Sequence, residues 1–232
     1  MKFIKILKDI FAPKKCYSCW KEWHFLCLSC LQKCDNFDES CFFCKNPSMN
    51  FEIHEDCKKE SNIDQIIVLT HYKNSVIKKL IKDAKFYKKK DILEDFSFYL
   101  SKLLLKYQKN IKKSDQLLIP VPMYFLRKWK RWYNQSEILS DNISKFTKIL
   151  SRSDILVRKR NTIQQSKIWM KQRQNNLLWA FWVKNKFQDI LRWKHIILVD
   201  DVISTGSTLI EIANLLKKYG VWKITVIVIA SD

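Results

Sequence analysis

The segment HIILVDDVISTGSTL, residues 195–209, constrains the fold more than any other part of this 232-residue chain. Its apolar run at 195–199 predicts a buried strand, and the helical spacing of apolar residues over 207–219 predicts a helix. We expect further strands at 64–72, 116–121, 153–157 and 224–229, and further helices at 75–84, 92–107 and 136–150. Because strands alternate with helices, we predict an α/β fold with a parallel sheet and flanking helices.

The turn between this strand and helix has the composition of an anion-binding loop. Backbone N–H groups of such a turn and of a helix N-terminus attract negative charge, and Gly206 would let a phosphate approach without a Cβ in the way. Hydroxyl donors flank the glycine at Ser204, Thr205, Ser207 and Thr208. Asp200 and Asp201 would repel a phosphate, but carboxylates suit sugar hydroxyls, directly or beside a magnesium ion. The segment therefore predicts a sugar-phosphate site.

Every cysteine lies in the first quarter of the chain, at Cys16, Cys19, Cys27, Cys30, Cys34, Cys41, Cys44 and Cys57. This break in composition predicts a boundary near residue 60, with one domain at 1–60 and a second at 61–232. Three Cys-x2-Cys pairs in a reducing compartment favour metal binding over disulfides.

The first two pairs supply four thiolates for one tetrahedral zinc ion, and the third pair begins a second candidate site. The spacing alone leaves open an interleaved arrangement in which the first pair shares a metal with the third. Cys34 belongs to none of the Cys-x2-Cys pairs.

Lys and Arg outnumber Asp and Glu by 43 to 23, which gives a formal net charge of +20. An excess of this size favours polyanionic partners, above all nucleic acid. The alternative is compositional, because the chain is rich in Lys, Ile, Asn and Phe, as AT-rich genomes tend to encode, and its lysines are spread along the sequence.

The apolar runs are too short to span a bilayer, so we expect no membrane insertion. The opening MKFIKILKDIFAPKKC has lysines at short intervals and no small-residue cleavage site. It predicts a short amphipathic helix and not a signal peptide, which favours a cytoplasmic protein.

Several motifs, in order along the chain, resemble the ComF family, the double-zinc-ribbon phosphoribosyltransferase-like proteins of bacterial competence. DIFAPKKCYSC is similar to the family's apolar helix and proline before the first Cys-x2-Cys. IPVPMYFLRKWKRWYNQSE resembles its PVP segment followed by Arg-Gly-aromatic-Asn-Gln, and RNTIQQSKIWMKQRQNNLLWAFWV resembles its Arg-x-Thr-x-x-Gln and Asn-x-x-Gly-Ala-Phe segment. VDDVISTGST resembles the phosphoribosyl-diphosphate signature of type I phosphoribosyltransferases.

The resemblance implies a type I phosphoribosyltransferase-like fold with an N-terminal zinc-ribbon module. The residues that would hold the phosphoribosyl group, with magnesium as a further cofactor, are Asp200, Asp201, Ser204, Thr205, Gly206, Ser207 and Thr208. Pro120, Val121 and Pro122 would line the pyrophosphate side, and Arg131, Asn134 and Gln135 would belong to the loop over the site.

The family pattern has a fourth Cys-x2-Cys where this chain has His54 and Cys57. Since imidazole is a good zinc ligand, these two residues would complete a site with Cys41 and Cys44. One or two zinc ions are therefore expected.

The function that the resemblance implies is that of a DNA-uptake accessory protein that binds single-stranded DNA. Its implied partners are a competence helicase and strand-loading proteins. The alternative is an active phosphoribosyltransferase of nucleotide metabolism, although no segment offers an evident purine or pyrimidine pocket. A purely structural zinc adaptor would leave the phosphate loop unexplained.

The chain has two glycines and nine tryptophans, whereas a chain of this length carries about 16 glycines on average. Tryptophans at turns, or at glycine positions of the family motifs, are Trp20, Trp132, Trp179, Trp193 and Trp222, and Trp23 and Trp182 fit the same pattern less firmly. Some bacteria read the codon UGA as glycine, whereas a common translation table gives tryptophan. We hypothesise that these positions are glycine in the natural protein. The alternative is a Trp-rich protein whose indoles stack on DNA bases.

Overall fold

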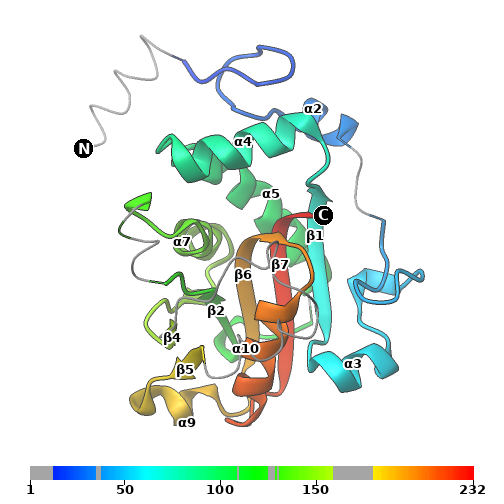
Figure 1. Cartoon of the computed structure of the whole chain (residues 1–232), viewed down its shortest axis with the longest axis vertical. Helices are drawn as coiled ribbons and strands as arrows, with labels where there is room; N and C mark the ends of the chain where they lie inside the picture. The colour runs from blue at the N-terminus through cyan, green and yellow to red at the C-terminus, as the bar shows by residue number, and fades with distance from the viewer. Residues whose placement is uncertain (1–12, 35–37, 109, 125–128, 130, 159–179) are drawn as a thin grey trace.

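The computed structural model describes residues 13–34, 38–108, 110–124, 129, 131–158 and 180–232 (Figure 1). Its helices are α2 (Leu28–Lys33), α3 (Glu55–Ser61), α4 (Ser75–Phe86), α5 (Ile92–Tyr107), α7 (Gln135–Thr147), α9 (Gln188–Leu191) and α10 (Ser207–Lys217). Its strands are β1 (Gln65–His71), β2 (Gln116–Pro120), β3 (Leu150–Ser151), β4 (Leu156–Arg158), β5 (Phe181–Val183), β6 (His195–Ile203) and β7 (Lys223–Ser231). Single 3₁₀ turns lie at Met49–Phe51, Lys113–Asp115 and Asn185–Phe187.

The central sheet is parallel and has the strand order β1-β7-β6-β2-β3. Helix α7 follows β2 and α10 follows β6, and these two helices pack on opposite faces of the sheet (Figure 1). The neighbouring strands β2 and β6 therefore continue to opposite sides, and ligands of open α/β sheets bind at the carboxyl ends of such a strand pair. The fold predicted from the sequence is confirmed.

Alternate residues of each central strand belong to two separate cores. On β6, Ile197 and Val199 face α4, α5 and α7, whereas Ile196 and Leu198 face α10. Both faces are thus buried, which is why the strands consist of continuous apolar runs.

The helices that cover the sheet follow from their apolar spacing. In α4 the buried side chains are Ile77, Leu80, Ile81 and Ala84, at the three- and four-residue intervals of one helix face. Asn74 caps the helix, since its side chain accepts hydrogen bonds from the N–H groups of Val76 and Ile77.

The cysteine-rich segment contributes to both cores. Cys16, Cys27 and Cys30 lie in the core under α4 and α5, whereas Cys41 and Phe42 lie in the core under α10. The segment also continues past the edge strand β1, where the N–H of Ile53 donates to the carbonyl of Asp64 (2.9 Å). A domain boundary near residue 60 stays a prediction.

The three largest differences from the expected boundaries are at β6, α7 and β4. Strand β6 continues through both aspartates to Ile203 because β7 pairs with it up to that residue. Helix α7 ends at Thr147, since Lys148 takes the left-handed conformation of a C-cap. The strand expected at 153–157 is Leu156–Arg158, which pairs with β5 outside the central sheet.

Within the ranges described, none of the helices combines the length and the apolar character that a membrane crossing requires. The amphipathic helix predicted at the N-terminus lies outside those ranges.

Four tryptophans have the backbone conformation that favours glycine. Their φ angles are 63° at Trp20, 77° at Trp23, 69° at Trp132 and 61° at Trp193. All four indoles are at least 61% exposed, so little packing compensates for the strain. These values support the glycine hypothesis at three of the five positions named first and also at Trp23. Trp222 is exposed but has no positive φ, and Trp179 lies outside the described residues.

Replacing Trp20, Trp23, Trp132 or Trp193 singly with glycine should raise the free energy of unfolding by up to about 1 kcal/mol. The left-handed conformation costs a residue with a side chain about 1–2 kcal/mol, and the added entropy of an unfolded glycine offsets part of the gain. Urea unfolding measures the change, with Trp222→Gly as the control that should not gain. Lower stability in all four variants would contradict this explanation.

The coding DNA tests the recoding hypothesis directly. UGG codons at Trp20, Trp132, Trp179 and Trp193 would rule it out, and UGA codons at these positions would support it.

Candidate functional site

The predicted phosphate loop connects β6 to α10. Gly206, with φ of +74°, is the N-cap of α10, and its buried backbone adopts the left-handed conformation. Ser204 and Thr205 are exposed, and the hydroxyls of Thr205 and Ser207 lie 2.8 Å apart. A pocket of about 60 Å³ is lined by Asp200, Val202, Ile203, Ser204, Gly206, Ser207, Thr208 and Leu209. The loop thus presents hydroxyls and a helix N-terminus at the carboxyl end of β6.

The two aspartates of β6 have different surroundings. Asp200 Oδ1 accepts hydrogen bonds from Ser136 Oγ (2.8 Å) and from the N–H of Asp201 (2.9 Å). Asp201 Oδ1 lies 2.9 Å from Nζ of Lys85 on α4. Burial, and then the neighbouring charge of Asp201, raise the pKa of Asp200 to about 7. The pair therefore carries less negative charge near neutral pH than two solvated carboxylates would.

Sequence reasoning missed Lys85 and Ser136. Ser136 follows the Asn-Gln motif directly, and its position on the first turn of α7 aims its hydroxyl at Asp200. Lys85 lies far from the acids in the chain, within a lysine-rich segment, so nothing in its local sequence distinguishes it.

The segment between β2 and α7 approaches the same end of the sheet. The N–H of Val121 donates to the carbonyl of Val199 on β6 (2.9 Å), so the chain stays beside β6 after β2 ends at Pro120. Asn134 Nδ2 donates to the carbonyl of Val121 (3.0 Å), and Asn134 Oδ1 caps α7. The structure thus brings Pro120, Val121, Pro122 and Asn134 to the site edge.

Gln135 and Arg131 are placed differently. The Gln135 side chain is buried, and its amide has no hydrogen-bond partner among the residues described. Such a buried amide is costly unless a ligand, a water or another group completes it. The guanidinium of Arg131 lies 5.1 Å from the ring centroid of Phe86, at the end of α4. Residues 125–128 and 130, between β2 and α7, and residues 159–179, which carry most of the third motif, lie outside the described residues.

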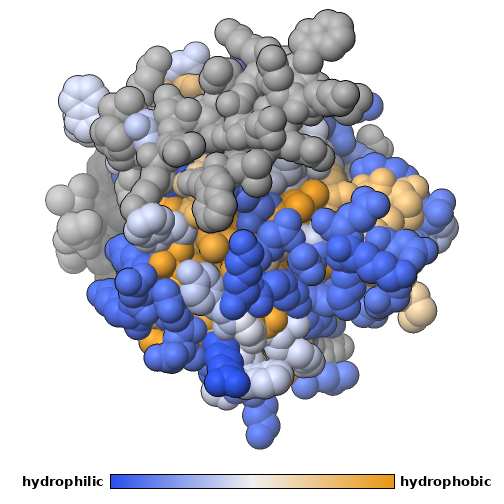
Figure 2. Space-filling model, turned by 60° about the horizontal axis from the view of Figure 1, so that its bottom comes forward, coloured by the Kyte–Doolittle hydropathy of each residue, from blue (hydrophilic) through white to orange (hydrophobic). Residues whose placement is uncertain are grey.

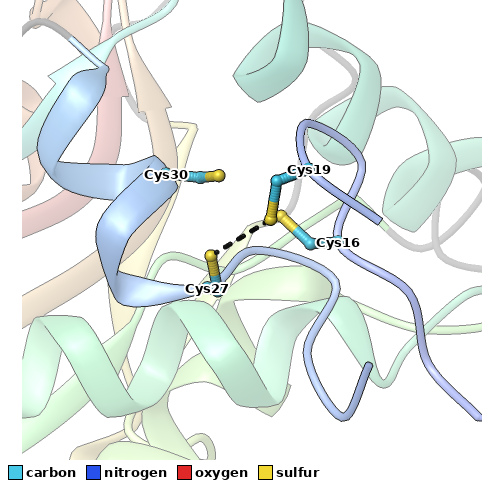
Figure 3. A group of neighbouring side chains, drawn as sticks. All are labelled: Cys16, Cys19, Cys27 and Cys30. Carbon is cyan, nitrogen blue, oxygen red and sulfur yellow. Dashed lines mark hydrogen bonds between the residues drawn. The ribbon is translucent and has the colours of Figure 1, made fainter. Parts of the chain in front are cut away.

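The first cysteine cluster is complete. The sulfurs of Cys16, Cys19, Cys27 and Cys30 point toward a common centre (Figure 3) and lie within 4.8 Å of one another. Burial raises the pKa of Cys16, but hydrogen bonds from the backbone of Cys27, Cys19 and Ser18 lower it to about 6. Four converging sulfurs, one of them easily deprotonated, fit a tetrahedral metal site.

Helix α5 holds this first cluster against the sheet. Asp95 Oδ2 accepts from the N–H of Phe25 (2.7 Å), and the hydroxyl of Tyr99 donates to the carbonyl of Leu26 (2.7 Å). The loop between the two cysteine pairs is thereby fixed to α5 by polar contacts.

The second cluster has three thiols, those of Cys41, Cys44 and Cys57, whose sulfurs lie within 4.8 Å of one another. His54 Nδ1 lies 3.2 Å from the sulfur of Cys44, so an imidazole is available as a fourth ligand. The Cys16–Cys19 and Cys41–Cys44 turns, which we call knuckles, are built alike. The residue after the second cysteine of each pair donates its N–H to the carbonyl of the first cysteine, Trp20 to Cys16 and Lys45 to Cys41 (2.9 Å each). Two metal sites fit the chain, and the sulfurs pair sequentially, without interleaving.

The chain is similar to several known proteins. A family model described as phosphoribosyl transferase domain matches residues 138–232. Competence protein F of Haemophilus influenzae is 33% identical over 226 residues, which cover 91% of this chain and 94% of that protein. DNA utilization protein YhgH of Escherichia coli K12 is 33% identical over 146 residues, or 61% of each chain. Among solved structures, a purine phosphoribosyltransferase from Pyrococcus horikoshii aligns with a TM-score of 0.37 and 18% identity, over 60% of this chain and 73% of that one.

The parallel sheet and the matching family model define a phosphoribosyltransferase-type domain. The match to competence protein F covers 91% of the chain. The chain belongs to the ComF family.

Metal analysis should find about two metal ions per chain, because each cluster converges on one centre. Cys19→Ser and Cys44→Ser should each lower the content by about one ion, since each removes one ligand from a different cluster. Cys34→Ser, which alters neither cluster, is the control. Two independent sites would be contradicted if either variant lost both ions, or if neither variant lost any.

Proposed function

We propose that this ComF-family chain is an accessory protein of DNA uptake whose phosphoribosyltransferase-type domain binds a 5-phosphorylated ribose, with phosphoribosyl diphosphate as the first candidate. The observation that carries the proposal is the junction of β6 and α10, where two carboxylates precede a glycine turn and a helix N-terminus. This junction lies at the strand pair where open α/β sheets bind their ligands.

Each part of the junction has a role toward such a ligand. The turn N–H groups and the hydroxyls of Ser204, Thr205, Ser207 and Thr208 would hold the 5-phosphate. Asp200 and Asp201 would hold the ribose hydroxyls, directly or beside a Mg²⁺ ion, which would offset the ligand's negative charge. Lys85 offsets the acid charge that would otherwise repel the ligand (2.9 Å to Asp201). The segment Pro120–Pro122 would line the diphosphate side, and Arg131, Asn134 and Gln135 would belong to the loop over the site.

Zinc is the metal that we propose for both cysteine clusters. Four thiolates, or three thiolates and an imidazole, are the donor sets of structural zinc sites. Reduced thiols would also fit a cytoplasmic protein.

The proposed role in DNA uptake rests on the relatives and on charge. The two curated relatives are described as a competence protein and a DNA utilization protein. The net charge of +20 suits a nucleic-acid backbone, and Figure 2 shows hydrophilic side chains over most of the coloured surface of one face. Single-stranded DNA is the proposed polyanion, with a competence helicase and strand-loading proteins as partners.

An active phosphoribosyltransferase of nucleotide metabolism is the second candidate. The acid pair and the glycine turn are equally compatible with catalysis and with binding of the ligand without a reaction. Release of diphosphate when a nucleobase is added separates the two candidates.

Changing both Asp200 and Asp201 to Asn should weaken binding of phosphoribosyl diphosphate at least about tenfold, or about 1.4 kcal/mol, because the sugar and Mg²⁺ lose both carboxylates. Calorimetry in Mg²⁺ measures the affinity. Asp56→Asn, an exposed acid on α3, is the matched control. Unchanged affinity in the double variant would contradict the site.

Ionisation of Asp200 should lower the free energy of unfolding. The pKa of Asp200 is about 7 when folded, against about 4 for an unfolded carboxyl, so folding opposes its ionisation increasingly as the pH rises from about 4 to about 7. The single variant Asp200→Asn should therefore be more stable than the natural chain at about pH 8 and equal to it below about pH 4. A variant that binds less ligand yet unfolds at higher urea would mark Asp200 as a residue retained for function.

Single-stranded DNA should bind with a steep dependence on salt. Contacts to about five phosphates would reduce the affinity roughly 100-fold between about 50 and 200 mM NaCl, because counterions are released on binding. Fluorescence anisotropy of an oligothymidylate measures this, and an uncharged methylphosphonate of the same sequence is the control. A flat salt profile, or equal binding of the uncharged strand, would support the compositional explanation of the lysine excess.

A further inference from the structure

The residues between Cys41 and Cys44 of the second cysteine cluster pack next to the phosphate loop. A Cβ at Gly206 would lie 3.4 Å from Cε1 of Phe42 and 3.5 Å from Cε1 of Phe43. These two phenylalanines occupy the x2 positions of the Cys41–Cys44 pair, so the metal knuckle itself presents two ring edges to the turn. The next nearest atom, Cδ1 of Ile203, is 3.7 Å away.

The two rings are held rigidly. Phe42 is buried in the core under α10, and its ring lies 5.3 Å from that of Phe43 at an angle of 84°. Nζ of Lys45 lies 4.2 Å from the Phe42 ring centroid. The two rings and the Lys45 side chain thus pack together within the segment that carries Cys41 and Cys44.

A second contact ties the same cluster to α10. Cys57 lies on α3, and Asn62, which caps that helix, donates through Nδ2 to Oδ1 of Asn214 (2.7 Å). The cluster therefore contacts α10 at its N-terminus, through Gly206, and again along its length. The first cluster lies in the opposite core and shares none of these contacts.

A phosphate loop needs such a support. Its N–H groups must be available for the ligand, and the bond that the Ser207 N–H makes to Thr205 Oγ1 is a long one (3.5 Å). Ser204 and Thr205 are exposed, and Gly206 has the freest backbone of any residue. Apolar contact from behind can hold the turn without consuming its donors.

We propose that Phe42 and Phe43 are positioning residues for the phosphate loop, and that metal binding at Cys41, Cys44 and Cys57 thereby sets its affinity for a phosphorylated ribose. The inference rests on the proposed function for the identity of the ligand. Among the described residues the first cluster makes no such contact with the turn, because it lies in the core on the other face of the sheet, so we expect it to affect the turn less.

Matched variants of the two clusters test this inference on the full metal-loaded chain. Cys44→Ser and Cys19→Ser remove equivalent exposed thiols, and Phe43→Leu and Phe25→Leu trim one ring near each cluster. Cys44→Ser and Phe43→Leu should weaken phosphoribosyl diphosphate at least tenfold in calorimetry, whereas Cys19→Ser and Phe25→Leu should change it less than threefold. Phe43→Tyr, which keeps the ring, should restore most of the affinity.

Hydrogen exchange of the amides at 203–209 gives a readout that needs no ligand. Exchange should quicken in Cys44→Ser and Phe43→Leu and stay unchanged in the first-cluster variants. If the unaltered chain fails to bind phosphoribosyl diphosphate, the proposed function is wrong, and the exchange data still decide whether the knuckle supports the loop. If the unaltered chain binds and all four variants bind and exchange alike, the positioning role is wrong. Should Cys44→Ser unfold, Phe43→Leu decides alone, since it leaves every metal ligand in place.

Discussion

A parallel sheet is stable only when both of its faces are covered, and in this chain the cysteine-rich segment supplies part of the cover on each face. The first cluster joins α4, α5 and α7 over one core, and the second joins α10 over the other. The strands β1, β7 and β6 carry apolar residues on both sides, so neither face could remain in water. The two cysteine clusters therefore share their cores with the sheet, so we expect metal binding at the clusters to stabilise the sheet as well.

The same arrangement sets the chemistry at the end of β6. Pairing with β7 and β2 buries the strand up to the acids, which places Asp200 against Ser136 and Asp201 against Lys85. Burying adjacent carboxylates opposes their ionisation, and this raises the pKa of Asp200. A protein that needed only a stable sheet would have no reason to keep two acids here, so their cost is an argument for function.

The sequence predicted the parts of this structure that are local. The apolar runs located the strands of the central sheet apart from β3, and the acids, glycine and hydroxyls of the phosphate loop stand next to one another in the chain. The cysteine spacing predicted two metal clusters, although it left their pairing open. The contacts between distant segments could not be predicted, because Lys85, Phe42 and Phe43 reach the loop only through the fold. The helix end at Lys148 also escaped prediction, since a lysine rarely signals a left-handed cap.

The tryptophans at turns fall into two groups by their backbone conformation. Composition alone pointed to a shortage of glycine, and the backbone then separated Trp20, Trp132 and Trp193, which adopt positive φ, from Trp222, which does not. The indoles of Trp20, Trp132 and Trp193 are exposed, and their backbone is in a conformation that is unfavourable for a residue with a side chain.

Whether the carboxyl end of β6 binds a phosphorylated ribose is tested most directly by a crystal structure of the metal-loaded protein with phosphoribosyl diphosphate and Mg²⁺. We predict the 5-phosphate on the N–H groups of residues 204–208, the ribose hydroxyls at the two aspartates, and the rings of Phe42 and Phe43 unmoved behind Gly206. An empty loop at saturating ligand, or a ligand bound elsewhere on the chain, would contradict the assignment of this site.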